Sequence, residues 1–345
     1  MNRRRFLRSA GLGALGLGCG MSALSGGETD EARDGKLPSF GWDGVPVYGH
    51  LGKTAGEFTE KEARFLASHY DFLCLEKAHA MDQHGATEPG TKADIRKLKA
   101  LNPDMKILFY WNAAIDYPFY AAGDSVQGDW HLEDASGEKL LVSGRFPYFD
   151  VSNPEMREWW TDVAAEMCGE GGADGVFVDA LAKYDAGVFA RHCGEKKDRQ
   201  LRRGMERMFA LLRKKLGQGG IILYNGLRTL NRGKVLGPDW LEMTDGATIE
   251  HFGHFRSGSK ESMASDMKFM QKGSRQGKIM VMKAWPGFDW IDREMMSKPH
   301  AHLLSLARKS IEFPLACYLV SAGRQGYFSY SWGYRADYGW MDWYP

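Results

Sequence analysis

Short apolar runs alternate with amphipathic helical segments along almost the whole chain, and this alternation limits the fold more than any other feature. The apolar runs are near-continuous, which is typical of parallel strands that are covered on both faces. Parallel neighbours need a crossover connection, usually a helix, so repeated units of this kind predict an α/β protein. The expected strands lie at 45–50, 72–76, 106–111, 174–179, 221–225, 247–250, 278–283 and somewhere within 316–330.

The segments between these runs carry helix-start signals. Thr59 is a plausible N-cap for the apolar spacing of residues 60–68. Asn153-Pro154 is an N-cap followed by proline at the first helical position, which predicts a helix over 154–167. Further helices are expected over 92–100, 195–216, 260–272 and 300–312.

Eight such units predict a single-domain (β/α)₈ TIM barrel over residues 41–345. A doubly wound open sheet is the main alternative. No glycine-rich phosphate loop follows the first expected strand, which weighs against that alternative. The long segment 112–150 interrupts the repeat, and on a barrel we expect it to roof the cleft.

The first 27 residues predict a twin-arginine export signal. Residues 3–8 read Arg-Arg-Arg-Phe-Leu-Arg, and the apolar run 10–17 follows them. This run is too short to span a bilayer, so we expect a periplasmic or secreted protein with residues 28–40 as a linker. Cys19 offers a lipid anchor as a weaker alternative, because the residues before it fit a lipoprotein signal poorly.

Charge and cysteine content narrow the partners. The 45 Lys and Arg residues nearly balance 44 Asp and Glu, and no long basic block lies beyond the signal, so nucleic acid is not an expected partner. The cysteine spacing matches no zinc pattern, and we expect no metal or other cofactor. Cys74 and Cys317 fall inside expected strands. Cys168 and Cys193 flank the strand at 174–179, and a disulfide between them stays open as an alternative to free thiols.

The expected strands at 174–179 and 247–250 each end in a carboxylate. Asp179 ends the run Asp-Gly-Val-Phe-Val-Asp, and Glu250 ends the run Ala-Thr-Ile-Glu. In barrels of alternating strands and helices, the carboxyl ends of the strands carry the chemistry. Two carboxylates at one rim suit acid/base work on a glycosidic bond, with Asp179 as nucleophile or stabilising carboxylate and Glu250 as general acid/base.

Polar and aromatic residues at the other strand ends are candidates for binding the sugar. Glu76 could instead pair with a cation of a neighbouring strand such as Lys283, and Asp150 could instead shape its loop. Trp111 and Trp285 offer flat apolar faces to a sugar ring, although they could equally fill the barrel. The expected substrate-binding residues are His50, Glu76, Lys77, Tyr110, Trp111, Asn112, Asp150, Asn225, His251, Lys283 and Trp285.

Four stretches carry a family resemblance: Phe-Leu-Cys-Leu-Glu-Lys at 72–77, Leu-Phe-Tyr-Trp-Asn at 108–112, Phe-Asp-Val-Ser-Asn-Pro at 149–154, and the run 174–179. Through them most of the mature chain resembles bacterial TIM-barrel glycoside hydrolases of the polysaccharide-degrading type. It is more distantly similar to clan D and polygalactosaminidase-like enzymes. In clan D the nucleophile ends strand four and the acid/base ends strand six, which implies these roles for Asp179 and Glu250. Clan D has Asp at the second place, so the assignment of Glu250 stays open.

The sequence therefore predicts an exported glycoside hydrolase that acts on a polysaccharide or oligosaccharide. A non-catalytic carbohydrate-binding protein on a degenerate barrel is the alternative, and a hydrolase or lyase of another class at the same rim is a third hypothesis. The glycoside hydrolase hypothesis requires that Asp179 and Glu250 face one open cleft. The Trp- and Tyr-rich segment 332–344 is expected either to seal the barrel floor or to join the site.

Overall fold

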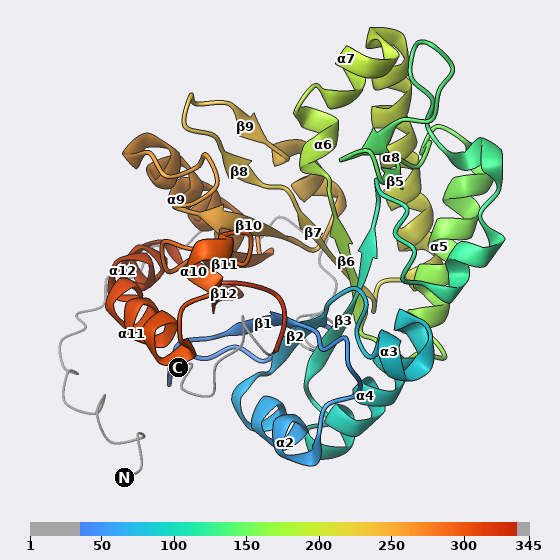
Figure 1. The fold of residues 1–345 in the computed structure, drawn as a ribbon. Coiled ribbons are helices and arrows are strands. Elements are labelled where there is room, and N and C mark those ends of the chain that lie inside the picture. The colour runs from blue at the N-terminus through green and yellow to red at the C-terminus, as the bar shows by residue number, and fades with distance from the viewer. Residues whose placement is uncertain (1–34, 337–345) are drawn as a thin grey trace, which may run out of the picture.

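Eight parallel strands form one sheet that curves into a ring, so the predicted (β/α)₈ barrel is confirmed (Figure 1). The computed structural model describes residues 35–336 of the chain. The first and last strands meet through the bridge between Val47 and Phe328, which closes the ring. The strands are β1 (Tyr48–Leu51), β2 (Phe72–Leu75), β3 (Lys106–Asn112), β6 (Gly175–Asp179), β7 (Ile221–Asn225), β10 (Gly246–Phe252), β11 (Ile279–Ala284) and β12 (Gly326–Tyr330).

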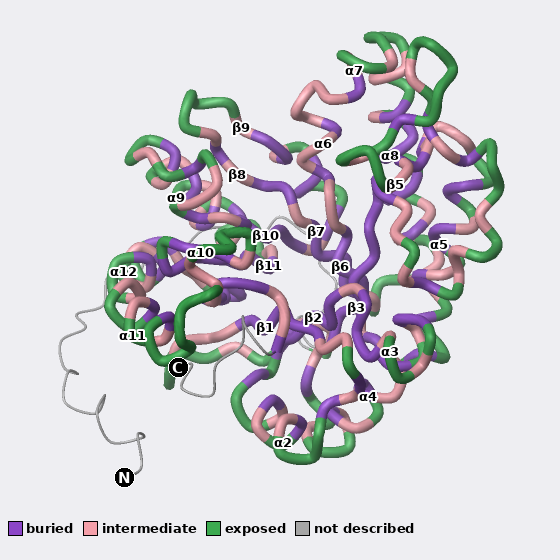
Figure 2. Tube along the Cα trace, in the orientation of Figure 1, coloured by how far each residue is buried: buried purple, intermediate pink, exposed green. Residues whose placement is uncertain are grey.

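Helices cover the outside of the ring, and the strands form the most continuously buried part of the chain (Figure 2). Two of the expected caps are present: Thr59 and Glu62 form a capping box, and the Asn153 side chain accepts two backbone N–H groups. The covering helices are α2 (Glu60–His69), α4 (Thr87–Leu101), α5 (Pro154–Cys168), α8 (Glu195–Leu216), α9 (Lys260–Arg275), α11 (His300–Ser310) and α12 (Glu312–Ser321).

Short elements stand on the loops that follow the carboxyl ends of the strands. After β6 come α6 (Ala182–Asp185) and α7 (Val188–Cys193), and after β7 comes a hairpin of β8 (Arg228–Thr229) and β9 (Val235–Leu236). In Figure 1, α6 and this hairpin stand on opposite sides above β7. Three residues of the insertion 112–150, Ile115, Tyr117 and Val142, line a cavity of about 610 Å³ beside these loops. The remaining elements are α3 (Met81–His84), η2 (Ala121–Ser125), η3 (Gly128–Trp130), β4 (Leu141–Val142), β5 (Phe146–Pro147), η4 (Pro238–Met243) and α10 (Arg293–Met296).

The eighth strand is shorter than the segment 316–330 in which it was expected. This segment begins inside α12, and β12 starts only at Gly326. Cys317 therefore lies on a helix rather than in a strand, because a short apolar run suits a packed helix as well as a strand. The sixth strand continues past Glu250 to Phe252, with consequences for the site.

Some expectations fall outside the described residues: the export signal at 1–27, Cys19 included, and residues 337–344 of the aromatic segment. Lys36 pairs with Asp245 at 2.7 Å, so the described chain contacts the barrel from near its first residue. All four cysteines within residues 35–336 are free thiols. None of the helices in that range combines the length and apolar character needed to cross a bilayer.

Candidate active site

Asp179, the last residue of β6, receives hydrogen bonds from three side chains. Tyr110 and Asn112 lie two residues apart on β3, so both face the inside of the ring. The Asn112 Nδ2 donates to Asp179 Oδ2 at 2.9 Å, and the Tyr110 hydroxyl donates to the same oxygen. The Asn225 Nδ2, at the end of β7, donates to Asp179 Oδ1 at 2.6 Å. Three donors around one carboxyl group suit a negatively charged side chain.

Glu250 shares the Asn225 amide with Asp179. The Asn225 Nδ2 also donates to Glu250 Oε2, so one nitrogen contacts an oxygen of each carboxyl group. The Tyr334 hydroxyl, from the segment after β12, donates to Glu250 Oε1. Two N–H···O bonds from one nitrogen span at most about 6 Å, so the two carboxyl groups are close enough to act on one bond.

Burial raises the pKa of Glu250, and the negative charge of Asp179 raises it further. The hydrogen bonds from Tyr334 and Asn225 lower it, but only in part. The side chain is buried and 8% of the residue is exposed, which explains why desolvation dominates. A carboxyl group with a raised pKa holds its proton at higher pH, as a general acid requires.

A bulge in β10 brings His251 to the same site. The strand pairs Glu250 with Lys283 and Phe252 with Ala284 of β11, so His251 is an extra residue without a partner. Its φ of 71° lies in the left-handed region. In a regular strand, successive side chains point to opposite faces. The bulge instead allows His251 and Glu250 to line the same cavities, and the His251 Nε2 lies 3.5 Å from Glu250 Oε2.

Glu76, at the end of β2, lies between two basic side chains. The His50 Nε2 of β1 lies 2.6 Å from Glu76 Oε2, and Lys77 pairs with the other carboxyl oxygen. Burial alone would raise the pKa of Glu76, but the charges of Lys77 and His50 outweigh it and hold the pKa at about 2. The sequence hypothesis that Lys283 pairs with Glu76 is wrong. The Lys283 ammonium instead donates to two backbone carbonyls.

We predict that Glu76→Gln lowers the free energy of unfolding by roughly 3 kcal/mol, because it leaves the buried His50 and the half-buried Lys77 without their carboxylate. The folded-state pKa of Glu76 is depressed, so its stabilisation is present above about pH 4.5 and is lost as pH falls toward 2. When the free energy of unfolding is measured by urea unfolding between pH 3 and 7, it should fall less steeply toward acid pH in the variant than in the wild type. Glu166→Gln, which breaks an exposed pair with Lys92, is the matched control and should change stability little. Equal effects of both variants would contradict the prediction.

Two cavities meet at Asp179, Asn225, Glu250 and His251. The first has a volume of about 260 Å³ and lies over the strand ends. The second has a volume of about 610 Å³ and lies between α6 and the β8–β9 hairpin. The side chains that line the first cavity but not the second are His50, Glu76, Lys77, Tyr110, Phe177, Trp290, Tyr334 and Arg335. The two carboxyl groups therefore face a shared space with room on either side.

Five of the expected binding residues do not line either cavity. Trp111 points outward from β3, and its Nε1 donates to the Trp160 carbonyl on α5 at 3.1 Å. Asp150 accepts from Ser152 and pairs with Lys197 at 2.6 Å, which fits the alternative that it shapes its loop. Lys283 and Trp285 lie against each other, with the ammonium 3.7 Å from the ring centre. Asn112 also lines no cavity, but it contacts the site through Asp179.

Sequence reasoning placed two important side chains poorly or not at all. Tyr334 was considered only as part of an aromatic segment with two possible positions, and the structure brings it to Glu250. Arg228, which lines the second cavity, was missed because it lies on a hairpin beyond a strand end. The pattern of strand ends gives no signal for either residue.

Comparisons with known proteins give a family and a fold for this chain. The model of a family described as hypothetical glycosyl hydrolase family 15 matches residues 99–345, which include both Asp179 and Glu250. The chain belongs to this family. The region that matches hypothetical glycosyl hydrolase family 15 begins at the end of α4 and includes most of the barrel. A search of curated protein sequences finds no match.

Solved structures similar to this family member share its barrel. A noncanonic maltogenic α-amylase from Thermotoga neapolitana has a TM-score of 0.51 at 14% identity, over 83% of this chain and 67% of that one. A GH36 α-galactosidase from Geobacillus stearothermophilus has a TM-score of 0.50 at 11% identity, over 83% of this chain and 38% of that one. The chain thus spans well under half of the galactosidase. At these identities the likeness shows the fold alone.

Proposed function

We propose that the chain is a glycoside hydrolase that cleaves a polysaccharide or oligosaccharide with Asp179 as nucleophile and Glu250 as acid/base. The observation that carries the proposal is the single Asn225 nitrogen that contacts both carboxyl groups where two cavities meet. The glycosidic bond would lie across this meeting point. The sugar that is attacked would occupy the first cavity and the leaving part the second.

The close spacing favours retention of configuration at the anomeric carbon. Retaining enzymes hold their carboxyl groups about 5–5.5 Å apart, and inverting enzymes about 6.5–9.5 Å, to leave room for a water. In the first step Asp179 bonds to the anomeric carbon and the bond from that carbon to the leaving oxygen breaks. The leaving oxygen takes the proton of Glu250. In the second step water loses a proton to Glu250, attacks the same carbon and releases Asp179.

The test is hydrolysis of a panel of plant and algal polysaccharides, measured as the release of reducing ends. NMR then identifies the anomer of the first product. We expect at least one substrate to be cleaved with retention. Binding without cleavage would favour the non-catalytic carbohydrate-binding alternative. A product with an unsaturated sugar would instead indicate a lyase, and an inverted product would remove the nucleophile role of Asp179.

Tyr334→Phe should move the alkaline limb of the kcat/KM profile upward by about one pH unit. The hydroxyl hydrogen bond lowers the pKa of Glu250, so its loss raises that pKa and keeps the acid protonated to higher pH. A hydrogen bond contributes about 1 kcal/mol, and one pKa unit corresponds to about 1.4 kcal/mol. The control is Tyr318→Phe, whose hydroxyl donates to the Gly326 carbonyl away from the site and should leave the profile unchanged. An unmoved limb in Tyr334→Phe would mean that another group sets it.

A further inference from the structure

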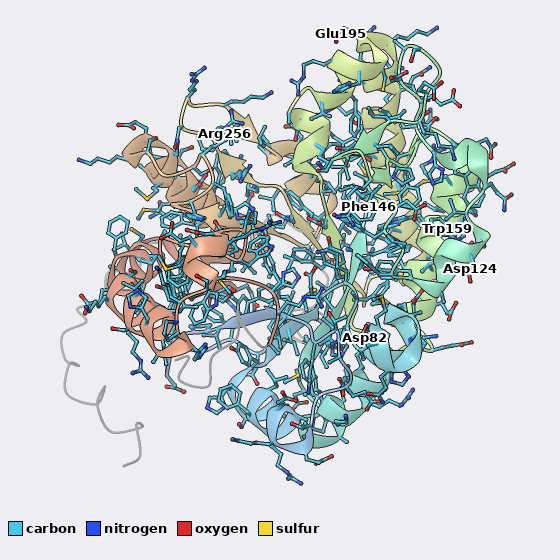
Figure 3. The ribbon with its side chains drawn as sticks, in the orientation of Figure 1. Asp82, Asp124, Phe146, Trp159, Glu195 and Arg256 are labelled. Atoms are coloured by element: carbon cyan, nitrogen blue, oxygen red, sulfur yellow. The ribbon has the colours of Figure 1, made fainter. Side chains whose placement is uncertain are left out.

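Apart from Asp179 and Glu250, the charged residues that line the second cavity are basic. Three basic residues line it: Lys183 on α6, Arg228 on β8 and Arg256 on the loop after β10. Figure 3 labels Arg256 near the β8–β9 hairpin. Asp179 and Glu250 are the acidic residues that line this cavity, and both lie at the end it shares with the first cavity.

Arg228 carries the strongest signal for a ligand. Its Nε and Nη1 atoms are buried and have no hydrogen-bond partner. Within residues 35–336, no carboxylate lies at ion-pair distance from its guanidinium. A buried charge is costly unless it is paired, so an unpaired guanidinium in a cavity wall points to a missing anion.

The nearby carboxyl groups do not take the place of that anion. Asp266 accepts from the backbone N–H of Thr229 at 2.7 Å through Oδ1, and burial raises the pKa of Asp266 to about 7. Glu250 is engaged by Asn225 and Tyr334. Both groups attract the guanidinium through space, but neither lies within ion-pair distance of it.

The other two basic residues are also free of carboxylates in the described part of the chain. The Lys183 ammonium donates to the Tyr148 hydroxyl at 3.2 Å and lies 5.3 Å from the centre of that ring. Arg256 is exposed and forms no ion pair with the described residues. Both are available to a ligand that enters the second cavity.

We propose that the second cavity binds a sugar that bears a carboxylate or a sulfate ester, with Arg228 as its main contact. This rests on the proposed function, because it makes that sugar the leaving part of the substrate. The guanidinium has a planar fork of donors that matches two oxygens of such a group. The catalytic carboxylates would repel an anionic sugar. The three basic residues make the electrostatic potential positive in the second cavity, where that sugar would bind.

The test measures binding and needs no turnover. Glucuronate and galactose 6-sulfate are compared with glucose and galactose by ligand-observed NMR titration of the wild-type chain. We expect at least one acidic sugar to bind about tenfold tighter than its neutral parent, as one charge-assisted fork would provide. The glucuronate and sulfate arms separate the two sources of negative charge. Arg228→Gln should abolish the preference, and Arg256→Gln should weaken it.

The matched control is Arg232→Gln, which removes an exposed cation from the tip of the same hairpin and lines neither cavity. It should keep the preference. Arg256 is exposed, so its variant should fold even if Arg228→Gln does not. Equal binding of acidic and neutral sugars, no binding of any acidic sugar, or an equal loss in Arg232→Gln would overturn the proposal.

These outcomes are separable from failure of the hydrolase proposal. A preference for acidic sugars in a chain that cleaves no glycan would keep this site and remove the catalytic one. Cleavage of neutral glycans without any such preference would keep the hydrolase and remove this site.

Discussion

Replacing Asp179 by asparagine should lower kcat/KM by roughly 10⁴-fold on the substrate identified by the panel. The amide cannot form the covalent bond to the anomeric carbon. Tyr110, Asn112 and Asn225 all donate to the carboxylate, so the NH₂ group of the asparagine would face hydrogen-bond donors in either orientation of the amide. Because the nucleophile is needed whatever the leaving group, the loss should be equally large on an aryl glycoside.

The control for this variant is Asp150→Asn. Asp150, like Asp179, is a half-buried aspartate, but it pairs with Lys197 and lines neither cavity. It should retain near-normal turnover. Thermal melts of both variants distinguish a lost reaction from a lost fold. Substantial activity in a folded Asp179→Asn protein would remove Asp179 from the mechanism.

Glu250→Gln should lower kcat/KM by about 10²–10⁴-fold on natural glycans, the range expected when a general acid is lost. An aryl glycoside with an acidic leaving group departs without a proton, so its first step should be much less impaired. This contrast between substrates is the signature of the acid role, and Asp179→Asn should not produce it.

The matched control is Glu242→Gln, which changes an exposed carboxylate outside both cavities. Its kinetics should stay close to wild type on both kinds of substrate. An equal loss on both substrates in Glu250→Gln would instead assign Glu250 to binding or to the arrangement of its neighbours.

The rim of the site was predictable because parallel strands bring their carboxyl ends to one edge. Asp179, Asn225 and Glu250 follow from this rule, and the structure brings all three together. The two-residue period of β3 also puts Trp111, which packs on α5, on the opposite face from Tyr110 and Asn112, which contact Asp179.

Other parts depend on contacts between segments distant in sequence. Arg228 reaches the second cavity only because a short hairpin folds back over β7, and Tyr334 reaches Glu250 across 84 residues. The position of β12 within 316–330 also depends on packing. The apolar run around Cys317 has no strong periodicity, so its packing decides between helix and strand.

The place where the ring closes has a consequence for proton affinity. Tyr334 is held by the start of the barrel: the Gly52 N–H donates to the Tyr334 carbonyl at 2.8 Å, beside an isolated bridge from Gly52 to Arg335. In the described chain, β1 and β12 meet only through such bridges, whereas other neighbouring strands pair over continuous stretches. Local opening begins where backbone pairing is sparse. Local opening between β1 and β12 would withdraw the Tyr334 hydroxyl from Glu250 and leave β6 to β10 intact. The pKa of Glu250 therefore depends on the most sparsely paired junction of the ring.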